Sequence, residues 1–241
     1  PAPRTVKRLW VELRLPDGGV KRLESREGEP LDLVEPGPQI PPVCEVLDGN
    51  RLLAWEPGPY RATRADGTYA SFETRGSSIV ALDSNWKLSF PEGWGTKGPV
   101  SFDRLESWTK LGLPEEGRAF SGTATYSREF DLRELSAGSR VVLDLGRVEV
   151  IADVKVNGQS VGRLWSPPYR IDISRAVKSG KNLLSVEVTN TWFNRLTYDA
   201  GLDAAQRRTW SIGGPRNGGA MIDSGLLGPV NLWVGQVLSE Q

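Results

Sequence analysis

Polar and aromatic side chains follow one another from Thr189 to Leu196, directly after residues 183–188, which alternate like a strand. A neutral sugar offers an apolar C–H face to an aromatic ring and a rim of hydroxyl groups to amides and guanidinium groups. A sugar-binding site therefore needs both kinds of side chain in one concavity. The same mixture recurs beside tryptophans of other predicted loops, so the candidate sugar contacts are Trp165, Trp192, Asn194, Arg195, Arg207 and Trp210.

In this interpretation Trp192 and Trp210 stack on the sugar, while Asn194, Arg195 and Arg207 donate hydrogen bonds to it. A structural role is the alternative, because a tryptophan at the base of a loop often covers the core, and for Trp165 and Trp192 the two roles have equal weight. Asn190 is expected to close the preceding strand by bonding to nearby backbone groups.

Histidine is absent from the 241 residues, and Cys44 is the single cysteine. These counts exclude Ser-His and Cys-His nucleophiles, imidazole-bound zinc, a thiolate cluster and a disulfide within the chain. Any chemistry would have to come from carboxylates, lysine, tyrosine or a cation bound by oxygen atoms.

Glycosidase chemistry needs two carboxyl groups about 5–9 Å apart, one of them with a raised pKa. Neighbouring pairs occur at Asp103 and Glu106, at Glu115 and Glu116, and at Asp199 and Asp203. Because the chain has 30 acidic residues, such neighbours arise by chance and are expected to be solvated. We therefore predict no catalytic residue.

The charges balance, with 30 Lys plus Arg and 30 Asp plus Glu, so no net field attracts nucleic acid or an anionic membrane. No apolar run approaches the roughly 20 residues that a membrane-spanning helix needs, and the amino terminus shows no secretory signal pattern. Since the chain begins at Pro1, it is expected to be a processed protein or a piece of a longer one. The expected partners are neutral molecules or other protein surfaces.

Short alternating runs separated by Gly, Pro and Asn recur throughout the chain and predict an all-β fold. Asn157-Gly158 lies between alternating residues and predicts a tight hairpin. Residues 1–80 are expected to form a small β subdomain with a Pro-rich connection. Residues 81–241 are expected to hold about eight strands in a jelly-roll β-sandwich, in which the loops after Val161, Val188 and Arg208 lie near one another.

Three segments in order, Phe120 to Leu132, Ala152 to Ser174 and Gly180 to Leu196, resemble the sugar-binding β-sandwich of family 2 glycoside hydrolases. With Trp86 to Gly95 and Ser224 to Val234 added, the chain resembles the carboxy-terminal region of family 106 glycoside hydrolases, the α-L-rhamnosidases. This resemblance implies a galactose-binding-like jelly roll. It also implies that the catalytic carboxylates lie in a separate, upstream barrel domain, and that the protein is secreted or periplasmic.

Three hypotheses follow. The first is a non-catalytic accessory module that binds an oligosaccharide or polysaccharide containing rhamnose. The second is a purely structural domain that packs on the catalytic barrel. The third is a small glycan-active enzyme that uses a carboxylate pair. No cofactor is assigned, and a structural calcium ion is the one that fold analogy leaves open.

Overall fold

The computed structural model describes residues 8–14, 20–26, 44–47, 51–74, 77–82, 84–133, 135, 138–215 and 219–239. The chain divides into two compact units, Pro1–Ile40 and Pro41–Gln241. In the first unit, β1 (Arg8–Arg14) pairs antiparallel with β2 (Val20–Arg26). The predicted Pro-rich connection lies outside the described residues.

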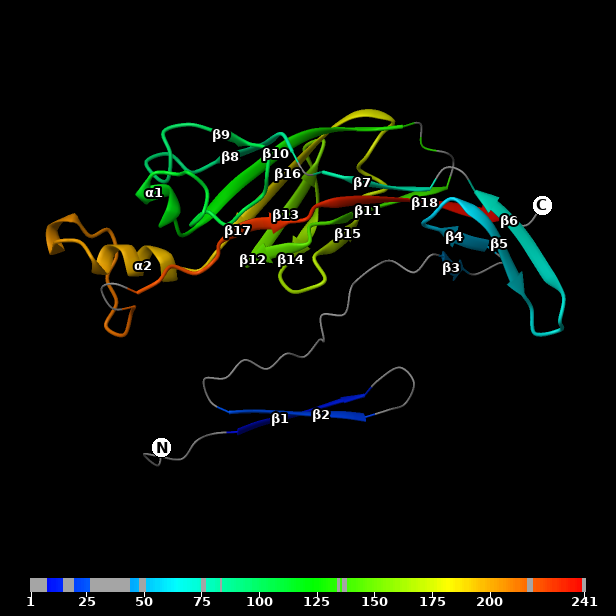
Figure 1. Cartoon of the computed structure of the whole chain (residues 1–241), viewed down its shortest axis with the longest axis horizontal. Coiled ribbons are helices and arrows are strands. Elements are labelled where there is room, and N and C mark those ends of the chain that lie inside the picture. Colours follow the sequence, from blue (N-terminus) through cyan, green and yellow to red (C-terminus); the bar gives the residue numbers. More distant parts are fainter. Residues whose placement is uncertain are drawn as a thin grey trace. The chain divides into compact units, whose positions relative to one another are not determined.

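The second unit contains two six-stranded sheets (Figure 1). The first sheet has the order β14 (Gln159–Leu164), β13 (Ile151–Val156), β16 (Gly180–Thr189), β10 (Thr123–Leu132), β8 (Trp86–Ser89) and β9 (Val100–Phe102). The second has the order β15 (Arg170–Asp172), β11 (Ser139–Asp144), β18 (Asn231–Ser239), β4 (Arg51–Ala54) and β3 (Cys44–Leu47), and β7 (Ser78–Ala81) also pairs with β18.

The smaller described elements are two two-stranded pairs and three short helices. β12 (Arg147–Glu149) pairs with β17 (Gly225–Gly228), and β5 (Gly58–Thr63) pairs with β6 (Tyr69–Thr74). The helices are α1 (Glu115–Arg118), α2 (Phe193–Ala200) and the 3₁₀ helix η1 (Ala204–Gln206). Among the described residues, no helix is long and apolar enough to cross a bilayer.

The core lies between the two sheets, because buried apolar residues of β13 and β16 in one sheet and of β11 and β18 in the other form one cluster. On β16, Leu184, Val186 and Val188 are all fully buried, and Val186 stands opposite Tyr126 of β10. Trp86 of β8 is fully buried as well. The predicted all-β sandwich is therefore confirmed.

Residues on both sides of position 80 share one sheet, which differs from the predicted division. β4 buries Leu52, Leu53 and Ala54 and pairs with β18, so that Ala54 stands opposite Gln236. The compact units divide between Ile40 and Pro41 instead. This pairing joins segments about 180 residues apart, and therefore leaves no local pattern from which it could be predicted.

The hairpin at Asn157-Gly158 is confirmed, since both residues have positive φ angles, 52° and 81°, as a tight turn between β13 and β14 requires.

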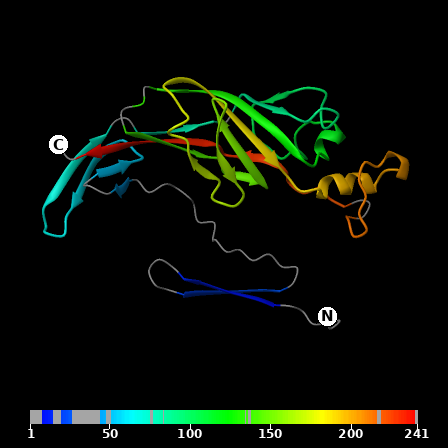
Figure 2. The ribbon, with the colours of Figure 1, turned by 180° about the vertical axis from the view of Figure 1, so that it is seen from behind.

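In contrast, residues 193–200 form helix α2 and not the predicted loop. The helix buries Asn194, Arg195, Thr197 and Asp199. The buried face of α2 is thus polar, which is the reverse of the apolar buried face by which helices are predicted. It lies at one end of the sandwich, and the β5–β6 hairpin lies at the other (Figure 2).

Candidate functional site

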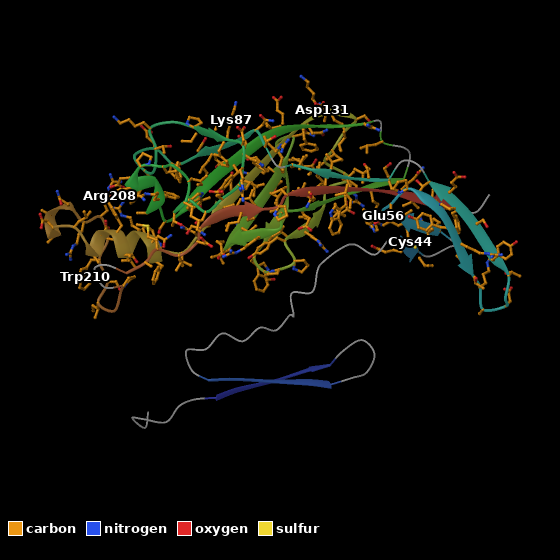
Figure 3. The ribbon with its side chains drawn as sticks, viewed as in Figure 1. Cys44, Glu56, Lys87, Asp131, Arg208 and Trp210 are labelled. Atoms are coloured by element: carbon orange, nitrogen blue, oxygen red, sulfur yellow. The ribbon has the colours of Figure 1, made fainter. Side chains whose placement is uncertain are left out.

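The exits of β14 and β16 lie at the same end of the first sheet. Leu164 pairs with Ala152, and the neighbouring Ile151 pairs with Thr189, the last residue of β16. The segments that carry Trp165 and Trp192 therefore leave the sheet at the end where α2 begins, as the predicted topology requires. Figure 3 shows Arg208 and Trp210 beside α2 at this end.

Asn190 closes β16 with its side chain, as the sequence predicts. Its Oδ1 accepts a hydrogen bond from the Gly122 backbone N–H at 2.9 Å. Its Nδ2 donates to the Phe120 carbonyl oxygen at 2.9 Å and to Ser224 Oγ at 3.1 Å. The residue thus fixes the point at which the chain leaves the strand and enters α2.

Asn194 is fully buried, which corrects its assignment as a sugar contact. Its Nδ2 donates to the Ile222 carbonyl oxygen at 2.8 Å and to Ser224 Oγ at 3.0 Å, and its Oδ1 accepts from the Ile222 N–H at 2.8 Å. Both ends of the amide are therefore occupied within the protein. Its function is to attach α2 to the segment that precedes β17.

Arg195 is also fully buried, and its assignment as a sugar contact is corrected too. Its Nη1 donates to Glu116 Oε2 at 2.6 Å, and its Nη2 donates to Asp199 Oδ1 at 2.5 Å. The guanidinium carbon lies 5.5 Å from the centre of the Trp94 ring. Burial alone would lower the pKa of Arg195, but its hydrogen bonds to the two carboxylates raise that pKa. The guanidinium group is thus a permanently charged structural link.

Asp199 extends this link to the segment that carries Trp210. Its second oxygen, Oδ2, accepts hydrogen bonds from the backbone N–H groups of Arg208 and Thr209, at 3.1 and 2.7 Å, and from Thr209 Oγ1 at 2.6 Å. Burial tends to raise the pKa of Asp199, but the hydrogen bonds from Arg195 and Thr209 outweigh it and lower the pKa below the usual range. The carboxylate therefore stays ionised and fixes residues 208–209 against α2.

The result is a shallow groove of about 430 Å³ at this end of the sandwich, which we call the tryptophan groove. It is lined by Trp192, Leu196, Thr209, Trp210 and Ser211. The two tryptophan side chains are largely exposed, at 53% for Trp192 and 76% for Trp210. The groove thus combines two available aromatic rings with two side-chain hydroxyl groups.

The other two predicted contacts lie outside the lining of the tryptophan groove. Trp165 is 71% exposed on the loop after β14. Arg207 is exposed, and its Nε donates to the Leu202 carbonyl oxygen at 2.9 Å. Sequence reasoning missed Leu196, which lies one helical turn after Trp192, because α2 was not predicted. It missed Thr209 and Ser211 because their segment meets α2 only through the link that Asp199 makes.

Within the described ranges, no three acidic or cysteine side chains converge to form a site for a metal ion. The carboxylates of this region pair with arginine, as Glu116 and Asp199 do with Arg195. A structural calcium ion stays a prediction from fold analogy.

Comparisons with known proteins give the class of this domain. Residues 118–213 match the family described as glycosyl hydrolase 2 galactose-binding domain-like. A protein from Formosa agariphila named "Putative beta-glucuronidase" is 35% identical over 188 residues, which cover 76% of this chain and 16% of that protein. The solved rhamnosidase from Novosphingobium sp. PP1Y has a TM-score of 0.59 at 26% identity, over 98% of this chain and 24% of that one.

A beta-glucuronidase from an uncultured Clostridium sp. shares the fold, with a TM-score of 0.51 at 20% identity over 68% of this chain and 30% of that one. The chain thus has an all-β fold of the galactose-binding-like sandwich class. More narrowly, the part of the chain that matches the glycosyl hydrolase 2 galactose-binding-like family is residues 118–213. The relatives are glycoside hydrolases, and the chain spans about a sixth of the curated relative and about a quarter of the rhamnosidase.

Proposed function

We propose that this chain is a non-catalytic accessory domain of a glycoside hydrolase that acts on a rhamnose-containing polysaccharide, and that its tryptophan groove binds saccharide. The observation that carries the proposal is the pair of exposed rings, Trp192 and Trp210, which line one groove together with the hydroxyl-bearing Thr209 and Ser211. Aromatic faces take the apolar side of a sugar ring, and hydroxyl groups bond to its rim.

The buried network beneath the groove supports the same proposal. Arg195 and Asp199 hold α2 and residues 208–209 together, so the backbone segments that carry the two rings are positioned before a ligand arrives. A preformed site loses less conformational entropy on binding than a flexible one. The polar residues of this end thus contribute to binding by positioning the aromatic ones.

The comparisons support an accessory role, because the chain matches only a part of each hydrolase. One solved neighbour is a rhamnosidase, and the sequence resembles the carboxy-terminal region of the α-L-rhamnosidases. On this proposal the catalytic carboxylates belong to an upstream domain, which is the second partner beside the polysaccharide. We also propose that the chain is related to the carboxy-terminal region of the family 106 glycoside hydrolases.

Calorimetry of the chain against rhamnose-containing oligosaccharides tests this proposal. Replacing both Trp192 and Trp210 by Ala should weaken binding at least about tenfold, or about 1.4 kcal/mol. The matched control is Tyr69→Ala, which removes an exposed ring at the opposite end of the sandwich. A separate Trp165→Ala variant shows whether the site extends to the β14 exit. Unchanged affinity in the double variant would overturn the assignment of the groove.

One observation favours the structural alternative, in which this end packs on a catalytic domain. Apolar side chains beside the tryptophan groove are exposed too, namely Phe193, Ile212 and Ile222, and Ile212 reaches 92%. Exposed apolar side chains that gather into a patch are typical of protein interfaces. A chain that binds none of the oligosaccharides, but associates tightly with the separately produced barrel domain, would favour packing over sugar binding.

The third hypothesis, a small carboxylate enzyme, finds no support at this end. A general acid needs a raised pKa, whereas the pKa values of Asp199 and Asp223 are both lowered. For Asp223 the largest cause is a hydrogen bond from Lys110. Turnover of an aryl glycoside by the purified chain would revive this hypothesis.

A further inference from the structure

A second hollow, of about 760 Å³, opens beside the β13–β14 hairpin, and we call it the arginine groove. Its lining includes Ser160 from β14, Ser139 and Arg140 from β11, Asp172 from β15, and the following Arg175. Its volume lies within the range of about 300–1,000 Å³ that is typical of small-molecule sites. β14 begins at Gln159, just after the hairpin turn, whereas Leu164 at its other end lies on the side of α2. The two grooves therefore lie at opposite ends of β14.

The lining of the arginine groove has a surplus of positive charge. The lining contains the guanidinium groups of Arg51, Arg140 and Arg175 and the single carboxylate of Asp172; without Arg51, which makes an interaction of its own, the formal charge is still +1. The chain as a whole has a net charge of zero. The surplus is thus a local feature and does not follow from a generally basic composition.

The carboxylate does not neutralise all of this charge. Asp172 Oδ1 accepts hydrogen bonds from the Ser174 N–H at 2.9 Å and from Ser174 Oγ at 2.5 Å. Its Oδ2 lies 3.7 Å from Arg140 Nη1, with both side chains about half exposed. Asp172 therefore stabilises the local turn at Ser174 and forms a loose ion pair with Arg140.

Arg175 is exposed, and within the described parts of the chain its guanidinium group makes no hydrogen bond or ion pair. Its backbone is nevertheless anchored, because its neighbour Ala176 and the nearby Ile173 are buried. The Ile173 N–H donates to the Val141 carbonyl oxygen at 2.9 Å, and the Ala176 N–H donates to the Ile173 carbonyl oxygen at 2.9 Å. The guanidinium charge of Arg175 is thus carried by an anchored backbone at the edge of the arginine groove.

From this arrangement we propose that the arginine groove is a second binding site, which takes an acidic saccharide through its carboxylate or sulfate groups. Guanidinium groups bind such oxyanions in a paired, directional geometry. The side chains of Ser139, Gln159 and Ser160 add hydroxyl and amide groups that match sugar hydroxyls. The choice of a saccharide over an acidic peptide rests on the proposed function, whereas the anion site itself does not.

Calorimetry of the full chain tests this site with four probes: trigalacturonate, the neutral trisaccharide maltotriose, sodium sulfate and tetraglutamate. Trigalacturonate should bind more tightly than the other three, and its affinity should fall as salt rises, since exposed charges are screened. Replacing Arg140 and Arg175 by Gln should weaken it at least about tenfold, while Lys at both positions should keep the salt dependence and restore part of the affinity. Arg133→Gln, another exposed arginine outside the groove, is the matched control and should change nothing.

Four results would overturn the proposal: equal binding of maltotriose, equal binding of sulfate, equal or tighter binding of tetraglutamate, and unchanged affinity of the Gln double variant. The Trp192→Ala, Trp210→Ala variant separates the two sites. It should retain trigalacturonate binding and lose the neutral rhamnose-containing ligands. Failure of the tryptophan groove and failure of the arginine groove thus give different patterns.

Discussion

Arginine serves opposite purposes in two regions of this molecule. Arg195 is fully buried below the tryptophan groove and donates to two carboxylates. Arg175 is exposed at the arginine groove, beside a carboxylate that is already bonded to Ser174. The same side chain thus stabilises the fold in one place and is available to a ligand in the other. Burial and the position of the partner carboxylates decide whether an arginine has a structural or a binding role, and residue type alone does not.

The two grooves also differ in which side chains they expose. At the α2 end, charged residues lie underneath and aromatic rings are exposed, so that the charges position Trp192 and Trp210. At the arginine groove, the charged residues themselves form the surface. Substitutions of charged residues should therefore affect stability in the first region and binding in the second.

The largest effect is expected from Asp199→Ala. It leaves the buried Arg195 guanidinium with one carboxylate and frees the N–H groups of residues 208–209, so the free energy of unfolding should fall by about 3–5 kcal/mol. Urea denaturation measures this change. Asp203→Ala, an exposed carboxylate in the same stretch, should stay within about 0.5 kcal/mol of the wild type. Equal stabilities of the two variants would contradict the structural role of Asp199.

Asn194→Ala should have the next largest effect. It removes three hydrogen bonds, which leaves the Ile222 backbone N–H and carbonyl groups without their partner and should cost about 1–3 kcal/mol of stability. Arg207→Ala is the sharpest comparison, because the sequence predicts both residues as sugar contacts. Arg207 is exposed, so its removal should alter the midpoint of thermal unfolding little. A stable Asn194→Ala variant with weakened sugar binding would restore the sequence prediction.

The pH dependence of stability tests the ion pair that Asp199 makes beneath the tryptophan groove. The folded-state pKa of Asp199 lies below its unfolded value of about 3.9, so the unfolded state binds more protons between the two values. The stabilising contribution is present in full above the unfolded pKa and is lost as pH falls through the folded pKa. Denaturation series from pH 7 to pH 2 should show a steeper acid loss in the wild type than in Asp199→Asn. Parallel curves would contradict the ion pair.

The smallest effect on stability is expected at the arginine groove. Arg140→Gln together with Arg175→Gln should leave the free energy of unfolding within about 0.5 kcal/mol, because exposed ion pairs contribute little. Thermal unfolding at low salt provides the measurement. A loss comparable with that of Asp199→Ala would show that these arginines stabilise the fold and do not form a free surface.

The sequence predicts the strands well where local patterns carry the information. β16 alternates in burial as its residues alternate in polarity, and Asn157-Gly158 turns where its composition requires. Helix α2 could not be predicted, because its buried residues are polar and bind one another. For the same reason, the sequence pattern predicted Asn194 and Arg195 as surface residues that contact sugar. Trp192 and Trp210 do line one groove, but the link through Asp199 that brings them together is a tertiary contact without a local signal.

The most direct measurement of the central claim follows the side-chain indole N–H signals of the nine tryptophans by NMR during titration with a rhamnose-containing oligosaccharide. The signals of Trp192 and Trp210 should shift with a single binding isotherm, while those of the buried Trp86 and Trp108 should stay in place. Constant signals from Trp192 and Trp210 at saturating oligosaccharide would contradict the assignment of this groove as the sugar-binding site.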